Sequence, residues 1–463
     1  MHWSPKVSNS EQPRYKAIAF AIANAIETRE LHPGERLPTH RELAKKLNVS
    51  VQTVSRAYAE AKRSSFVSCE VGRGTFVRTT RPSPEAPLSE IPTRTDMVDF
   101  SGATPLASSE QVEALRSTLS GIANSVDLSM LREDQPSNGS YFQREAAVQW
   151  LGENGVTVSP QETVLFDGLP QALWAALSVL ADPGDVVATE SLTSNDLIRT
   201  TSMLKLNLRG LPLDDEGVDP DALEQLCKTA NVKVLCLTPT YSNPMVALMG
   251  EKRRRKLVEI SRMYDVAILE TDPYRPLMSK PPRVMQSMAP ERVWYVTNFS
   301  STIMTWLSTT FLVCPADAIS RLLPRLPALG RRLSPGADDV TSHWIYDGTI
   351  EKLVRQHKLK LAARHRIFEE LMRDYRYRGY QDCMHVWLNL PEQWRSSRFV
   401  RDALSHGLIV TPPDPFIVGR AVEPHAVQIS IGNFLLADDV FRRGVERLSR
   451  LLAKEPELLA VGY

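Results

Sequence analysis

A series of short apolar runs in the middle of the chain places the strongest constraint on its fold. The runs "DVVAT", "VKVLCLTP", "VAILE", "VWYVTNF" and "TFLVCP" lie between residues 185 and 315. Helical patterns such as "REAAVQWLGENG" and "PQALWAALSVLADPGD" accompany them. Apolar runs of about four to eight residues with helices between them indicate buried parallel strands in an α/β layer. Further on, "HVWLNLP", "GLIVTP" and "AVQISIG" among helices predict a smaller α+β lobe.

A proline-rich segment divides this region from the N-terminal part of the chain. With 463 residues, 43% of them hydrophobic, the chain is long enough for more than one domain. Residues 79–96 contain four prolines and almost no periodic apolar pattern, which is typical of a semi-extended linker. We therefore expect an N-terminal domain over 1–78, a linker over 79–98 and a large domain over 99–463, whose small lobe begins at about 350.

Neither a targeting segment nor a metal site is predicted. No run approaches the roughly 20 apolar residues of a membrane-spanning helix, and "MHWSPKVSNSEQPRYK" lacks the apolar core of a signal peptide. We therefore expect a cytoplasmic protein. The cysteines have no metal-ligand spacing and are expected to be reduced thiols; they are Cys69, Cys227, Cys236, Cys314 and Cys383.

The charges are distributed unevenly between the two parts of the chain. Residues 1–80 contain 13 Lys and Arg against 7 Asp and Glu, a net charge of +6, whereas the whole chain carries only +1. The remainder therefore carries −5. A basic N-terminal domain on an acidic body suggests that this domain meets a polyanion.

Local signals divide the N-terminal domain into helices and a hairpin. A first helix ends before Pro33-Gly34. In "THRE", Thr39 caps a helix over about 40–47 and Glu42 reaches back, which forms a capping box. Ser50 caps the next helix, over about 51–63, and the two form a helix-turn-helix. The residues expected to pack them together are Leu43, Leu47, Val49, Val54, Ala57 and Tyr58.

The residue types exposed by this motif suit DNA. Near the start of the second helix, Gln52, Thr53 and Arg56 occupy positions where recognition helices meet base edges and phosphates. "FVSCEVGRGTFVR" predicts a two-stranded wing, and Arg73 at its tip is suited to a minor groove. The alternative is a small protein-interaction domain with solvated charges. The caps, the turn, the wing and the positive charge together favour DNA binding.

The same segment resembles the GntR-type winged helix-turn-helix. "LHPGERLPTHRELAKKLNVSVQTVSRAY" and "GRGTFV" match that family's motif over about 65 residues. The resemblance implies that Arg41 contacts phosphate or base and that Ser50, Gln52 and Thr53 lie at contact positions, with Thr75 in the wing. Many relatives have arginine where this chain has Val51, so the resemblance also implies a different operator.

The body resembles the aminotransferase-like domain of the MocR subfamily, which has the fold of type I enzymes dependent on pyridoxal phosphate (PLP). The resemblance rests on four motifs in the correct order: "GLPQALWAALSVLADPGDVVATES", "TPTYSNPMVALMGEKRRRKL", "LETDPYRPL" and "APERVWYVTNFSSTI". It implies a winged head joined to a dimerising body. Such a site needs a lysine that forms a Schiff base with the cofactor, a carboxylate for the ring nitrogen and donors for the phosphate.

Some of these functional groups are kept in this sequence. By the resemblance, Asn243 and Tyr274 match the residues that hold the ring hydroxyl. Asp272 is a candidate partner of the ring nitrogen, but Thr271 occupies a place where relatives often carry an acid, so the alternative is that this contact is lost. All of them also fit a purely structural role.

Other groups are absent at the positions that the resemblance assigns. Ser301, preceded by Ser300, stands at the lysine position, and Ser308 stands at the phosphate-binding arginine. The phosphate turn reads Gly168-Leu169-Pro170, which loses a side-chain donor and a backbone N–H. Ser194 replaces the aromatic residue that stacks on the ring, and Gln428 replaces the arginine that binds the substrate carboxylate. No lysine lies between Lys280 and Lys352.

These losses favour a DNA-binding regulator over an enzyme. We expect a homodimer whose catalytically inactive body acts in dimerisation and in sensing a small-molecule effector. The alternatives are an aminotransferase, or a PLP-responsive regulator, that uses an unexpected lysine such as Lys252 or Lys280. Phe299, Met304, Trp306 and Phe311 should make the former site more apolar. The basic run "EKRRRK" (251–256) is expected to be a solvated face at a helix start.

Overall fold

The computed structural model divides the chain between Thr95 and Asp96 into a head and a body, and each is described by itself. It describes residues 14–27, 30–31, 35–63, 67–70, 74–77, 97–125, 136–329, 336–419 and 423–454. The proline-rich segment 79–96 and the wing tip at Arg73 lie outside these residues. No helix in the described parts is long and apolar enough to cross a membrane.

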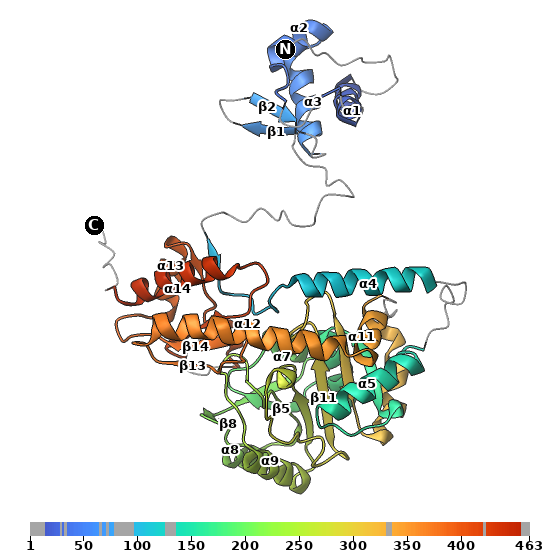
Figure 1. Ribbon diagram of the computed structural model, residues 1–463, viewed down its shortest axis with the longest axis vertical. Coiled ribbons are helices and arrows are strands. Elements are labelled where there is room, and N and C mark those ends of the chain that lie inside the picture. The colour runs from blue at the N-terminus through green and yellow to red at the C-terminus, as the bar shows by residue number, and fades with distance from the viewer. Residues whose placement is uncertain are drawn as a thin grey trace. The chain divides into compact units, whose positions relative to one another are not determined.

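The head is a winged helix-turn-helix (Figure 1). Its elements are the helices α1 (Arg14–Glu27), α2 (His40–Leu47) and α3 (Val51–Arg63) and the strands β1 (Val67–Glu70) and β2 (Gly74–Val77). The predicted bounds of α2 and α3 are confirmed. The wing has one feature that the sequence did not reveal. Leu37 N–H donates to the Thr75 carbonyl and Val77 N–H to the Glu35 carbonyl, so residues 35–37 add a third extended segment.

One apolar cluster holds the head together. Ile18 and Ile22 of α1 pack with Leu43 of α2 and with Val54 and Tyr58 of α3. The predicted contact residues of the helix-turn-helix belong to this cluster, with Leu47 and Val49 at its edge. The Tyr58 hydroxyl donates to the Pro38 carbonyl at 2.7 Å, which ties α3 to the start of α2. The face of α3 that points away from this cluster is therefore held in one orientation within the head.

A seven-stranded mixed sheet forms the centre of the body. Across the sheet, the strands are β4 (Thr163–Asp167), β12 (Thr309–Val313), β11 (Val293–Asn298), β10 (Ala267–Thr271), β9 (Val232–Leu237), β5 (Val186–Glu190) and β6 (Asn207–Leu211). From β11 to β6 the pairs are parallel, as predicted. The expectation of a parallel strand at "TFLVCP" is wrong, because β12 runs antiparallel to both β11 and β4. A parallel connection needs a crossover of about a dozen residues or more, and only residues 299–308 join β11 to β12.

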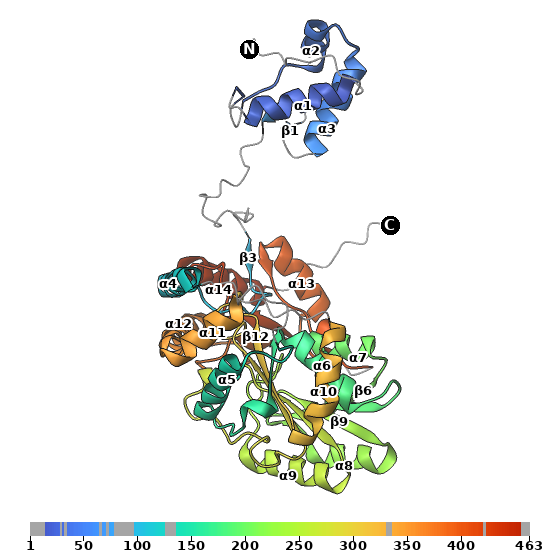
Figure 2. The same cartoon turned by 90° about the vertical axis from the view of Figure 1, so that its right-hand side faces the viewer.

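Helices cover both faces of this sheet (Figure 2). On β4, Val164 and Phe166 face α6 (Leu169–Leu180), while Leu165 between them packs towards α5 (Tyr141–Glu153). This alternation is that of a strand buried on both faces. The other helices and the hairpin of the large part are α4 (Ser109–Ser125), α7 (Asn195–Met203), α8 (Pro220–Thr229), α9 (Glu251–Met263), α10 (Ile319–Leu322), α11 (Ala337–Tyr346), β7 (Leu213–Asp214) and β8 (Gly217–Val218).

The small lobe is α+β, as predicted. It contains α12 (Thr349–Met372), β13 (Tyr377–Arg378), β14 (His385–Asn389), α13 (Ser396–Ser405), β15 (Leu408–Ile409), β16 (Ala426–Ser430) and α14 (Asp438–Leu452). Strands β13, β14 and β16 form an antiparallel sheet. β3 (Val98–Asp99) pairs with β15, so residue 98 belongs to the body and the expected linker ends before it.

Candidate functional site

The turn between α2 and α3 is built by the predicted caps. Glu42 N–H donates to the Thr39 hydroxyl at 3.4 Å, and Thr39 N–H donates to the Glu42 carboxylate at 2.9 Å. Asn48 ends α2 with φ 49°, a left-handed conformation that turns the chain towards α3. Thr53 N–H then donates to the Ser50 hydroxyl at 3.1 Å, which fixes the start of α3.

The residues expected to contact DNA differ in their exposure. Arg41, Gln52 and Arg56 are exposed. The hydroxyls of Ser50 and Thr53 lie 2.8 Å apart, so these two side chains also hold the helix start. Thr75 differs from the others because it is buried, at 6% exposure. Its side chain therefore supports the wing from inside and is not available to a DNA strand.

In the body, the resemblance assigns the lysine to position 301 and the phosphate contacts to positions 168 and 308, and these positions lie at the same end of the central sheet. Ser300 and Ser301 follow β11, and Ser301 N–H donates to the Asn298 side chain at 3.3 Å. Gly168 has φ 92° and stands directly before α6. Its N–H donates to the Ser308 carbonyl at 2.8 Å. The fold thus brings the expected phosphate turn against Ser308, although 140 residues separate Gly168 from Ser308 in sequence.

Asn243 and Gln428 meet across the two lobes. The Gln428 side chain on β16 donates to the Asn243 side-chain oxygen at 2.8 Å. Near them, Tyr241 donates to the Asp382 carboxylate at 2.6 Å and stacks on Tyr380. Direct contacts between side chains therefore join the large part of the body to the small lobe here.

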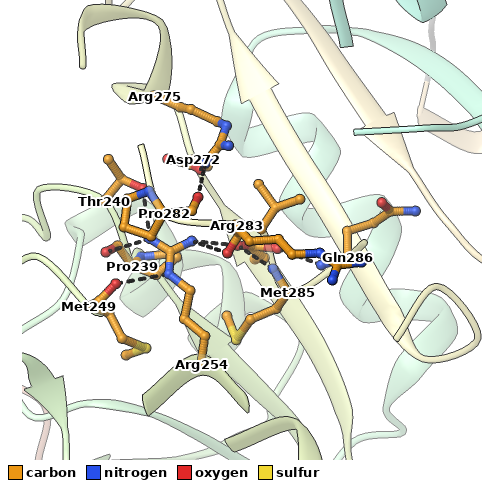
Figure 3. Close-up of polar contacts among 12 residues, drawn as sticks. Pro239, Thr240, Met249, Arg254, Asp272, Arg275, Pro282, Arg283, Met285 and Gln286 are labelled. Atoms are coloured by element: carbon orange, nitrogen blue, oxygen red, sulfur yellow. Dashed lines mark hydrogen bonds and ion pairs between the residues drawn. The ribbon is translucent and has the colours of Figure 1, made fainter. Parts of the chain in front are cut away.

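Thr271 and Asp272 face different surroundings. Thr271 lines a small cavity together with Glu190, Ser194 and Thr238. Asp272 is fully buried, and Arg275 lies 3.8 Å from one of its oxygens (Figure 3). Burial raises the pKa of Asp272, against the lowering effect of Arg254 and Arg275.

The cavity beside Thr271 has a mixed polar and apolar lining and is very small. The volume in which the centre of a water-sized molecule fits is about 10 Å³. This is enough for about one water. Glu190 borders it and accepts from Thr238 N–H at 2.9 Å and from the Thr189 hydroxyl at 3.1 Å. Burial raises the pKa of Glu190.

Arg254 is the exception to the expected solvated basic face at 251–256, because Lys252, Arg255 and Lys256 are exposed as predicted. The run does begin a helix, α9, but the Arg254 side chain has no exposed surface. It donates to carbonyls of Met249, Pro239 and Arg283, to the Thr240 hydroxyl and, at 3.3 Å, to the Glu270 carboxylate (Figure 3). The helical period explains the difference, since Arg254 shares its buried face with Leu257 and Val258. A basic residue in phase with these apolar residues was the signal in the sequence.

Two side chains that the sequence did not single out hold the loop of residues 299–308. The His357 Nδ1–H donates to the Thr302 carbonyl at 2.7 Å, and Nε2 accepts from Leu106 N–H at 3.2 Å. Gln111 donates to the Ile303 carbonyl at 2.6 Å. Because His357 uses one nitrogen as donor and the other as acceptor, its ring must be neutral. Burial lowers the pKa of His357 to about 4.

The apolar residues expected at the former site divide into two groups. Phe299 packs between Trp150 and Phe311, with ring centres 5.2 and 5.3 Å apart, and belongs to the core. Trp306 is 46% exposed at the end of the loop. Phe299 and Phe311 are thus buried in the core, whereas Trp306 reaches the surface.

Comparisons with known proteins follow the same division into head and body. Residues 14–77 match the family described as "Bacterial regulatory proteins, gntR family". The HTH-type transcriptional regulator YdeF of Bacillus subtilis is 27% identical over 431 residues, 93% of each chain. The aromatic-amino-acid aminotransferase 1 of Thermococcus litoralis is 25% identical over 67% of this chain and 78% of its own.

Solved structures share the fold of the body. The kynurenine aminotransferase of Pyrococcus horikoshii superposes with a TM-score of 0.70 at 23% identity, over 77% of this chain and 91% of its own. The α-aminoadipate aminotransferase LysN of Thermus thermophilus gives a TM-score of 0.68 at 22% identity, over 77% and 92%. The predicted fold class, a winged head with an aminotransferase-like body, is therefore confirmed.

Proposed function

We propose that this chain, a transcriptional regulator of the GntR/MocR type with an aminotransferase-like body, binds DNA through its head and no longer performs Schiff-base chemistry in its body. The proposal of DNA binding rests on the exposed face of α3, the capped second helix of the helix-turn-helix in a GntR-type head. The second part rests on the residues at the former cofactor edge.

DNA binding is assigned to the exposed side of the helix-turn-helix. Arg41 and Arg56 offer positive charge, and Gln52 offers an amide that can pair with an adenine edge. Ser50 and Thr53 lie beside them at the helix start. Arg73 completes this proposed set from outside the described residues, and the buried Thr75 is left out of it.

Replacing Arg56 with alanine should weaken binding to an operator duplex by roughly 5- to 150-fold, because it removes about 1–3 kcal/mol of contact energy. If the arginine contacts a phosphate, the slope of log affinity against log salt should also fall by about one. Fluorescence anisotropy with a duplex selected from a random library measures both. Lys16→Ala, an exposed change on α1 outside the helix-turn-helix, is the matched control, and equal losses in both variants would contradict the assignment.

The groups at the former cofactor edge do not fit PLP. A serine hydroxyl at position 301 cannot form an imine with an aldehyde. Ser308 and Gln428 supply no positive charge for a phosphate or a carboxylate. Thr271, which lines the small cavity, cannot act as the charged partner of a ring nitrogen, and Asp272, the other candidate, is buried beside Arg275. The alternative lysines, Lys252 and Lys280, are exposed. No step through the cofactor is therefore part of the proposal.

Incubation with PLP followed by borohydride should leave no stoichiometric adduct on a single lysine. The reason is the absence of a positioned amine, so only scattered, substoichiometric labelling of surface lysines is expected. Absorbance spectra and peptide mass spectrometry provide the measurement, with a PLP-dependent aminotransferase of the same fold as positive control. A one-to-one adduct at one lysine would instead favour the alternative of a PLP-responsive regulator or an aminotransferase.

We further propose that the body joins two chains, so that two heads meet two operator half-sites. Exposed apolar side chains on the body support this role. Val112 and Leu119 of α4 are 54% and 39% exposed and lie seven residues apart, on one face of the helix. Any effector at the cavity beside Thr271 must displace the side chains around it, because the space holds only about one water.

A further inference from the structure

Val51 is an exposed apolar residue in the part of α3 that faces outward. It is the first residue of α3, and 48% of its surface is exposed. Val54, Ala57 and Tyr58 of the same helix are buried in the core of the head. A single exposed valine is ordinary on a protein surface. The contacts and exposure of the residues next to Val51 indicate which role this valine can have.

The first turn of α3 leaves few side chains for base edges. The Ser50 hydroxyl caps the helix through Thr53 N–H, and the two hydroxyls contact one another at 2.8 Å. Gln52 follows Val51 and is exposed, and Arg56 is exposed one turn later. Val51 and Gln52 are therefore adjacent outward-facing residues at the N-terminal end of the helix.

The N-terminal residues of a recognition helix contact base edges in the major groove. An isopropyl group has no donor or acceptor for a guanine, a cytosine or an adenine edge, but it matches the one apolar feature of the groove, the C5-methyl group of thymine. We infer that Val51 is a specificity-determining residue that reads a thymine methyl group in each operator half-site. This inference rests on the proposed DNA-binding function.

The test separates the inference from that function. Duplexes are first selected from a random library with the full-length protein, and each thymine of the selected site is then replaced by uracil, which removes only the methyl group. We expect one thymine per half-site at which the replacement weakens binding about fourfold, the effect of roughly one buried methylene-sized group. In Val51→Ala, the same replacement should weaken binding less than about twofold.

Each outcome bears on a different claim. If no thymine is sensitive, or if Val51→Ala keeps the full sensitivity, the inference is wrong while DNA binding stands. If the full-length chain selects no duplex at all, the proposed function fails and the inference with it. Circular dichroism of Val51→Ala checks that the head is folded, which is expected because Val51 lies outside its core.

Discussion

Replacing Arg254 with methionine should lower the free energy of unfolding of the body by about 3–5 kcal/mol, the effect of breaking a buried ion pair by removing one partner. Methionine keeps an unbranched apolar stem but is shorter than arginine and leaves the Glu270 carboxyl without its cation. Glu270 has no exposed surface and also accepts from the N–H groups of Met285 and Gln286. Even beside Arg254, burial raises the pKa of Glu270 to about 7. Three carbonyls and the Thr240 hydroxyl also lose a donor.

The neighbouring arginine provides the control. The Arg255 side chain is 61% exposed and pairs with Glu251 one turn earlier on α9, so Arg255→Met should cost less than about 1 kcal/mol. Chemical denaturation followed by tryptophan fluorescence measures both, since seven of the eight tryptophans lie beyond residue 99. Adding Glu270→Gln to Arg254→Met should recover part of the loss, because no buried carboxyl then remains unpaired. Similar costs for Arg254→Met and Arg255→Met would show that Arg254 is not a buried anchor.

The fold was predictable from sequence wherever a local signal is sufficient. The bounds of α2 and α3 follow from the capping residues Thr39, Glu42 and Ser50, which act within one turn of the chain. The strands follow from apolar runs, but a run does not encode its direction. The direction of β12 depends on the short connection from β11 and on its pairing with β4, which is distant in sequence.

The sequence predicted which residues belong to the candidate site, but it did not predict which of them contact one another. A family resemblance suggested Gly168, Ser308, Asn243 and Gln428, and the structure brings them into two contacting pairs. Nothing in the sequence marked His357, because its two hydrogen-bond partners, Leu106 and Thr302, lie in separate segments and offer only backbone groups. Contacts between a side chain and distant backbone leave no residue pattern.

His357 should make the body less stable in mild acid. An ordinary histidine titrates near 6.5, whereas burial lowers the pKa of His357 to about 4 in the folded chain. As the pH falls from 6.5 to 4, the unfolded chain gains a proton that the folded chain does not take up, so stability is lost across this window. At about 1.4 kcal/mol per pKa unit, the full loss is about 3 kcal/mol. Burial also lowers the pKa of His385 to about 4, so His385 should act in the same direction.

The effect of His357 must be separated from buried carboxyls that act in the opposite direction. Burial raises the pKa values of Glu190, Glu270 and Asp272, so these groups favour the folded chain as the pH falls. The quantity to measure is therefore the difference in unfolding free energy between wild type and His357→Gln at several pH values. Glutamine cannot gain a proton, so the difference should shift by about 3 kcal/mol towards the variant between pH 6.5 and pH 4. A difference that stays constant over this range would mean that His357 takes up its proton in the folded body, and that its contacts with Leu106 and Thr302 do not fix a neutral ring.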